Sequence, residues 1–248
     1  MNIDYPTQQQ LGQLKNLWQE AFGDPEEFLT QFYTHGFAAD RCRCISVDDA
    51  LCAALYWFDC QLSGQPIAYL YAIATAKSHR GQGFCRILVE NTLSLLENLG
   101  YAGAILVPAE ESLFPMYEKM GFQNSVPIAE FSCEAAAPAA QLQKLTATEF
   151  SNLRRNYLPA GGVAQESGMK FLETMASFYA GENFLVVASK EHAFFPELLG
   201  DTAAAPHILS ALNLKKGHFC TVGAGKSFAL YHSFGDLPTP TYFSLAFD

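Results

Sequence analysis

Positive charge is scarce in this sequence, and the few basic residues do not gather into a patch. The chain carries 15 Lys and Arg residues against 25 Asp and Glu residues, which gives a formal net charge of −10. Because a nucleic-acid backbone would be repelled by such a surface, we expect no DNA or RNA partner. The acidic balance is compatible with a cationic amine substrate, although solubility alone also explains it.

The sequence also lacks the apolar runs that membranes and secretion require. No stretch approaches the roughly 20 apolar residues of a transmembrane helix, and Met1–Tyr5 has neither the basic nor the apolar region of a signal peptide. We therefore expect a soluble, cytoplasmic protein without a membrane partner. Since 50% of the 248 residues are hydrophobic, the chain can bury the core of one large or two small domains.

The cysteines do not indicate a disulfide framework or a metal site. There are seven, an odd number, and Cys42 and Cys44 alternate on an expected strand. No second Cys-x-Cys motif or His-bearing partner motif completes a zinc set. We expect buried free thiols in a reducing cytosol and no bound metal.

What the sequence does contain is a glycine-bearing turn, Arg80-Gly81-Gln82-Gly83-Phe84-Cys85. Residues 67–75 before it form an apolar run typical of a buried strand. After it, apolar residues recur at intervals of three and four, as on one face of a helix. Free N–H groups at a helix start, next to glycines that allow close approach, favour phosphate oxygens. A plain strand-to-helix turn is the alternative interpretation.

The remaining pattern predicts an α/β fold with a mixed sheet. In the first half it predicts helices beginning near Thr7 and Asp24, a meander of strands at 42–47, 51–62 and 66–75, a helix at 82–99, a strand at 102–107, a helix at 110–120 and a closing strand or pair at 122–133. Residues 134–140 have the simple composition of a linker. Beyond it we expect helices at 148–157, 167–179 and 204–212 and strands at 184–189, 192–199, 218–222, 228–233 and 242–247.

The turn and a second block together resemble the GCN5-related N-acetyltransferase (GNAT) family. That family's acyl-CoA loop has the pattern Arg/Gln-x-x-Gly-x-Gly/Ala, and its Tyr-Glu-Lys-x-Gly-Phe element is similar to Tyr117–Phe122 within the block Leu113–Phe122. The resemblance covers about residues 1–134. It implies an acyl-CoA N-acyltransferase-like fold, a mixed and mostly antiparallel sheet flanked by helices. Residues 135–248 would form a smaller, degenerate copy, as in two-domain members of the family.

The resemblance implies a cofactor site at the turn. Arg80, Gly81, Gln82, Gly83, Phe84 and Cys85 would hold the diphosphate of acetyl-CoA, and Ile73, Ala74 and Thr75 would pair with its pantetheine arm and offer an N–H to the thioester oxygen. Two departures stand out. Cys85 replaces the usual Gly or Ala, and Val107-Pro108-Ala109 lacks an Asn that many relatives use to hold the cofactor.

The resemblance also implies that Tyr117 is the general acid that protonates the leaving thiolate, a packing tyrosine being the alternative. The base is not identified, because Glu110 and Glu111 are more typical of helix caps. The chain ends in the apolar run Thr241–Phe247, so we hypothesise that the terminal carboxylate of Asp248 is packed and takes a catalytic role.

The expected function is acetyl-CoA-dependent transfer of an acetyl group, without a covalent enzyme intermediate, to an amine of an unidentified small molecule or protein. The alternative is a non-catalytic acyl-CoA-binding sensor or interaction module. A nucleotide P-loop at Gly223–Ser227 is disfavoured, because Cys220 stands where its first glycine would be and a strand follows. A hairpin turn is predicted there instead. Candidate aromatic walls for the acceptor, which are more often core residues, are Phe22, Phe28, Phe32, Tyr56, Trp57 and Phe58.

Overall fold

The computed structural model describes residues 1–247. By their contacts these residues group into two compact units. Unit 1 comprises Met1–Cys60, Gln65–Asn124 and Leu230–Leu237, and unit 2 comprises Gln61–Gly64, Ser125–Ala229 and the residues from Pro238 on. The expected division of the chain after residue 134, with a degenerate copy following it, stays a prediction.

Unit 1 is built on a mixed, mostly antiparallel sheet, as the sequence predicts. Its strands, in spatial order, are β1 (Asn2–Asp4), β2 (Cys42–Val47), β3 (Ala50–Leu62), β4 (Gln65–Thr75), β5 (Gly103–Leu106) and the end of β12 (Lys216–Ser233). β4 and β5 are parallel, whereas β5 and β12 are antiparallel. The short β1 was not predicted, and neither was β12 as the neighbour of β5.

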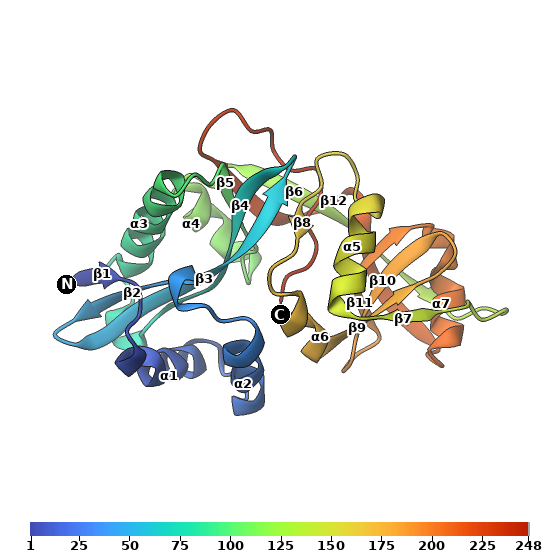
Figure 1. Cartoon of the computed structure of the whole chain (residues 1–248), viewed down its shortest axis with the longest axis horizontal. Coiled ribbons are helices and arrows are strands. Elements are labelled where there is room, and N and C mark those ends of the chain that lie inside the picture. The colour runs from blue at the N-terminus through green and yellow to red at the C-terminus, as the bar shows by residue number, and fades with distance from the viewer. Residues whose placement is uncertain (248) are drawn as a thin grey trace. The chain divides into compact units, whose positions relative to one another are not determined.

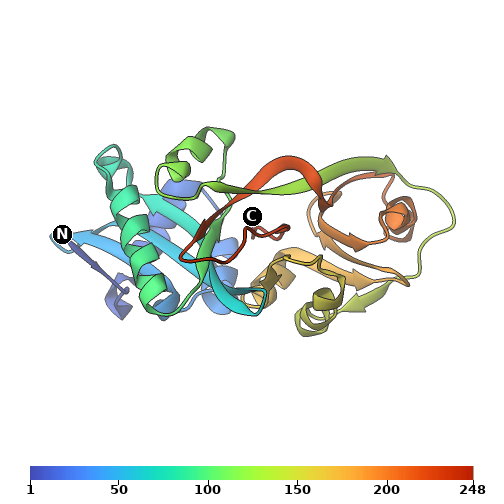
Figure 2. The ribbon, with the colours of Figure 1, turned by 90° about the horizontal axis from the view of Figure 1, so that it is seen from above.

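Helices cover both faces of this sheet (Figure 1). On one side lie α1 (Leu11–Phe22) and α2 (Glu26–His35), where Trp18 and Phe32 pack on Tyr56 and Tyr71. On the other lie α3 (Phe84–Asn98) and α4 (Phe114–Glu118). Figure 2 shows α3 running across the strands. Successive strand residues alternate between the two cores, as their period of two requires.

Short 3-10 helices complete unit 1 at Gln8–Gln10, Ala39–Arg41, Lys77–His79 and Glu111–Leu113. Thr7 lies at the N-cap of the first of these, directly before α1, and its N–H donates to the Gln10 side chain at 2.9 Å. The helix expected near Asp24 is α2, which begins after Pro25. Asp24 is not its N-cap, because its carboxylate accepts a hydrogen bond from the Trp18 indole at 2.7 Å.

Unit 2 has a sheet in which β12 lies between β6 and β11. Its elements are β6 (Asn124–Glu134), β7 (Gln143–Leu145), α5 (Ala147–Tyr157), β8 (Ala164–Gln165), α6 (Met169–Met175), β9 (Ala176–Ala180), β10 (Phe184–Ser189), β11 (Phe194–Gly200), a 3-10 helix (Thr202–Ala204), α7 (Ala205–Ala211) and β12. Ile208 and Leu209 of α7 pack with Val186, Leu198 and Phe219 in one apolar core.

Three sequence-based predictions for this half are wrong. Residues 176–180 form β9 rather than the end of a helix, and the segment 242–247 makes only an isolated bridge at Tyr242. The predicted hairpin at Gly223–Ser227 lies within the continuous strand β12. The glycines there serve close packing, because a Cβ on Gly225 would lie 2.3 Å from the carbonyl oxygen of Ile128 on β6.

Among the described residues, none of the helices is both long enough and apolar enough to cross a membrane.

A fully buried ion pair organises unit 2. The Arg154 guanidinium on α5 donates two hydrogen bonds to the Glu197 carboxylate on β11, at 2.7 and 2.8 Å, and a third to the carbonyl oxygen of Val163. Glu197 also accepts from the hydroxyls of Tyr242 and Ser244. Because Arg154, Glu197 and the pair Tyr242 and Ser244 come from three different segments, the ion pair anchors the C-terminal segment to the helix and the sheet.

Replacing Arg154 by Met, or Glu197 by Gln, should lower the free energy of unfolding by about 3–5 kcal/mol, since the remaining buried group loses its counter-charge. The change is measured by urea unfolding followed by far-UV circular dichroism. Arg155→Met is the matched control. Arg155 pairs with Glu166 at 2.6 Å with its side chain 54% exposed, so its loss should cost no more than about 1 kcal/mol. Equal effects of Arg154→Met and Arg155→Met would contradict this role.

Candidate active site

The strand β4 separates from β5 near its C-terminal end. Their parallel register ends at Leu70 opposite Leu106, and Ala72 follows with a φ of 47°. The left-handed conformation costs a residue with a Cβ roughly 1–2 kcal/mol, so the backbone is strained at Ala72. Two residues beyond Leu106, Pro108 has no N–H with which to extend the ladder. In the described register, Ile73–Thr75 therefore have no partner on the β5 side.

The turn after β4 is held by hydrogen bonds to three other segments. The N–H of Ala76 donates to Cys52 O on β3 at 2.8 Å, and the N–H of Lys77 donates to the Glu20 carboxylate on α1 at 2.7 Å. The Arg80 guanidinium reaches back to Thr75 O at 3.1 Å. The exposed Arg80 side chain therefore braces the turn against the end of the strand.

Gly81 and Gly83 give the turn its backbone shape. Their φ angles are 74° and 84°, and a Cβ at either position would meet nothing within 4 Å. Glycine is thus required for conformation and leaves open space above the backbone. α3 starts directly afterwards, and its first hydrogen bond runs from Ile87 N–H to Gly83 O. The first-turn amides of this 15-residue helix have no partner within it, so the turn suits an anion.

The other residues of the turn support it. The Gln82 side chain donates to Ser78 O at 3.1 Å, and Phe84 stacks edge-on against His79. Phe84 and Cys85 pack against the core of unit 1. Burial raises the pKa of Cys85 to about 11, so its thiol stays protonated and is not an activated nucleophile at neutral pH.

Tyr117 on α4 lies next to the first turn of α3. Its side chain is 7% exposed, and burial, followed by the electrostatic influence of neighbouring Cys85, raises its pKa. Arg86 joins the two helices by donating to Lys119 O at 3.2 Å. Among residues 1–247 the Tyr117 hydroxyl has no hydrogen-bond partner. A protonated phenol is therefore placed beside the turn with its proton uncommitted.

Sequence reasoning missed the contribution of the C-terminal strand to this region. His232 Nδ1 lies 2.7 Å from Gly121 O, directly after α4. Gly121 has a φ of 98°, and a Cβ on it would come within 2.6 Å of His232 Nδ1. The only local signal was the glycine itself. The left-handed conformation of Ala72 had no signal in the sequence, since alanine does not favour that conformation.

Of the remaining candidate residues, some lie on the surface and others are buried in the core. Glu110 and Glu111 are exposed, and Glu110 accepts a hydrogen bond from Ser112, as expected of residues at a helix start. Of the candidate aromatic walls, Phe32, Tyr56, Trp57 and Phe58 are buried in the core. Phe22, which is 43% exposed, and the half-buried Phe28 are the two that reach the surface. Asp248 lies outside the described residues.

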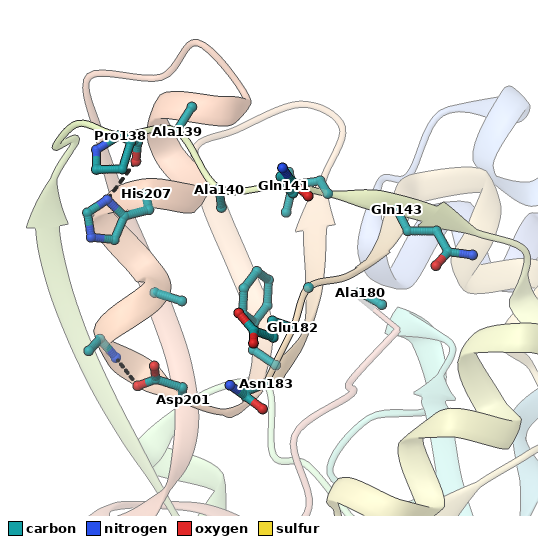
Figure 3. Close-up of a pocket in the computed structure, with 15 residues that line it drawn as sticks. Pro138, Ala139, Ala140, Gln141, Gln143, Ala180, Glu182, Asn183, Asp201 and His207 are labelled. Carbon is teal, nitrogen blue, oxygen red and sulfur yellow. Dashed lines mark hydrogen bonds between the residues drawn. The ribbon is translucent and has the colours of Figure 1, made fainter.

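Unit 2 contains a pocket of 740 Å³ beside the turn that follows β11, drawn in Figure 3. Asp201 lies in this turn, and its carboxylate accepts the N–H of Ala203. Glu182 lies on the same side of the pocket, whereas His207 contacts the carbonyl oxygen of Pro138 at 2.7 Å. The negative charge of these carboxylates disfavours binding of a diphosphate in this pocket.

Comparison with known proteins matches this arrangement to one family. Residues 2–124 match the acetyltransferase (GNAT) domain. A GCN5-related N-acetyltransferase from Kribbella flavida has a similar structure, with 16% identity, a TM-score of 0.68 and coverage of 94% of this chain and 69% of its own. The corresponding enzyme from Anabaena variabilis shows 14% identity, a TM-score of 0.66 and coverage of 93% and 71%.

A protein from Pyrococcus horikoshii matches over 99% of this chain and 94% of its own, with 12% identity and a TM-score of 0.67. At these identities the structures show the fold alone, and they confirm the predicted acyl-CoA N-acyltransferase-like class. A comparison with curated proteins found no match.

The loss of unfolding free energy caused by a Gly→Ala substitution should be larger where less space surrounds the glycine. Gly83→Ala should cost about 1–2 kcal/mol from backbone strain alone. Gly121→Ala should cost more, because the Cβ also displaces His232. Gly12→Ala is the control: this glycine lies inside α1 with open space around it and should gain roughly 0.5–1 kcal/mol. Unfolding free energies test the order, and a Gly121→Ala as mild as Gly83→Ala would refute the assigned His232 contact.

Proposed function

Because this chain belongs to the GCN5-related N-acetyltransferase family, we propose that it transfers an acetyl group from acetyl-CoA to an amine. The observation that carries this proposal is the anion-receptive turn at residues 80–85, placed after the unpaired end of β4 and beside the buried, protonated Tyr117. In this proposal the turn binds phosphate, the open strand edge of β4 pairs with the cofactor, and Tyr117 is the acid.

Two segments of unit 1 bind acetyl-CoA in this proposal, the turn at the start of α3 and the end of β4. The amides of Gly81–Cys85 donate hydrogen bonds to the diphosphate of acetyl-CoA, and the dipole of α3 adds partial positive charge there. The open backbone of Ile73, Ala74 and Thr75 pairs with the pantetheine amides. An N–H from this strand end then stabilises the negative charge that develops on the thioester oxygen.

In the transfer itself the acceptor nitrogen attacks the acetyl carbonyl carbon, forming the C–N bond as the C–S bond breaks. Tyr117 gives its phenolic proton to the departing sulfur, and the proton from the amine passes to a base. The raised pKa of Tyr117 keeps the phenol protonated before the step. Once CoA leaves with that proton, the phenolate recovers a proton from solvent.

The acceptor is an amine of a small molecule or a protein. The exposed Phe22 and the half-buried Phe28, beside the turn between α1 and α2, are the aromatic groups we assign to its recognition. Cys42, Cys44, Cys52, Cys85, Cys133 and Cys220 are free thiols, which supports action in a reducing compartment, the cytoplasm. Pro108, which offers neither an N–H nor a side-chain amide, favours the alternative function, an acyl-CoA sensor that binds without turnover.

Tyr117→Phe should lower kcat by about 10²–10⁴-fold with little change in KM for acetyl-CoA, because only the transferred proton is lost. Thiol release is measured with acetyl-CoA against a panel of amines. Tyr101→Phe is the control, since Tyr101 donates to Asp59 before β5 begins, at the opposite end of that strand from Pro108. If calorimetry detects CoA binding but no amine supports thiol release, the sensor replaces the transferase. If CoA does not bind, both fail.

A further inference from the structure

In unit 2, β6 and β12 pair with each other (Figure 1). Three side chains from these two strands, which are distant in sequence, converge there. Glu130 comes from β6, and His218 and Cys220, two residues apart, come from one face of β12. A carboxylate oxygen, a ring nitrogen and the sulfur all lie within 4.8 Å of one another. Cys220 Sγ is 3.8 Å from Glu130 Oε1, and His218 Nε2 is 3.8 Å from Glu130 Oε2.

These separations are close to those of ligands around one metal ion. Zinc–ligand bonds of about 2.0–2.3 Å in a tetrahedron place neighbouring donor atoms roughly 3.3–3.7 Å apart. Shifts of up to about 1 Å in the donor atoms would therefore complete the site. A thiolate, an imidazole and a carboxylate form a donor set that suits zinc, whereas magnesium and calcium prefer oxygen alone.

We propose that Glu130, His218 and Cys220 bind one zinc ion that clamps β6 to β12. The site departs from the expectation that the protein binds no metal, and it does not rest on the proposed acetyl transfer. Three protein ligands leave a fourth position for water.

The surroundings of His218 prepare it for this role. Its Nδ1 lies 3.0 Å from the Ser132 hydroxyl, also on β6, which leaves Nε2 as the nitrogen turned toward Glu130. Metal-binding histidines are commonly oriented in this way through their second nitrogen. Phe194 stacks on the imidazole with an interplanar angle of 16° and limits its rotation.

Two groups oppose metal binding: the Lys226 side chain must move away from Glu130, and the Cys220 thiol must lose its proton. Lys226 Nζ lies 2.8 Å from Glu130 Oε1, but its side chain is 53% exposed and can turn into solvent. Burial, and then the charge of Glu130, raises the pKa of Cys220 to about 12, so the metal-free thiol is protonated. Zinc binding forms the Zn–S bond as the thiol proton leaves to solvent, as is usual for coordinating cysteines.

The experiment titrates Zn²⁺ into the chelator-stripped full-length protein in competition with a chromogenic chelator. We expect one zinc per chain and a higher Tm with zinc bound. Cys220→Ser, His218→Ala and Glu130→Gln should each weaken zinc binding at least about tenfold. Cys133→Ser and His192→Ala, a cysteine and an exposed histidine outside the cluster, should leave it unchanged. Co²⁺ should give a thiolate charge-transfer band that Cys220→Ser abolishes.

Lys226→Met should tighten zinc binding, because it removes the cation that competes for Glu130. Failure of the wild-type chain to bind zinc, or equal zinc affinity in Cys220→Ser and Cys133→Ser, would overturn the proposal. Unchanged or weaker binding in Lys226→Met would also overturn it, by excluding Glu130 as a ligand. Glu130 and Lys226 are exposed, so these variants should fold, and circular dichroism without zinc confirms it.

Discussion

The early end of the β4–β5 ladder is the constraint on which the candidate active site depends. Pairing stops at Leu70 and Leu106, since Ala72 takes a left-handed conformation and Pro108 has no N–H to donate. A regular parallel pair would have continued and left no open backbone after Leu70. The free end of β4 is followed in the chain by the glycine turn and then by the start of α3. The early end of the β4–β5 pairing therefore leaves an open strand edge directly beside the candidate anion site.

Unit 1 is nevertheless not formed by consecutive sequence. The last residues of β12 pair with β5, and His232 contacts the carbonyl of Gly121 beside the helix that carries Tyr117. The C-terminal part of the chain therefore contributes to the packing around the candidate general acid. β6, which the sequence suggested as the closing strand of the first half, pairs instead with β12.

Unit 2 has one polar cluster in its interior and another on the surface of its sheet. The Arg154–Glu197 pair is buried, and it holds the C-terminal segment through hydrogen bonds from Tyr242 and Ser244. The cluster of Glu130, His218 and Cys220 lies instead where β6 and β12 approach closely enough to require Gly225. Both arrangements join segments that are distant in sequence, so neither has a local motif.

The sequence by itself determined the elements whose signals are local. Periodicity defined β2 to β4 and α3, glycines defined the turn at 80–85, and two motifs indicated the family, since each depends only on neighbouring residues. Only the tertiary structure decided the left-handed conformation of Ala72 and the continuous strand through Gly223–Ser227. It also decided that β12 lies beside β5 and that Glu130 converges with His218. These features depend on which strands pair, and strands that are distant in sequence stabilise each other through contacts that no short stretch of sequence encodes.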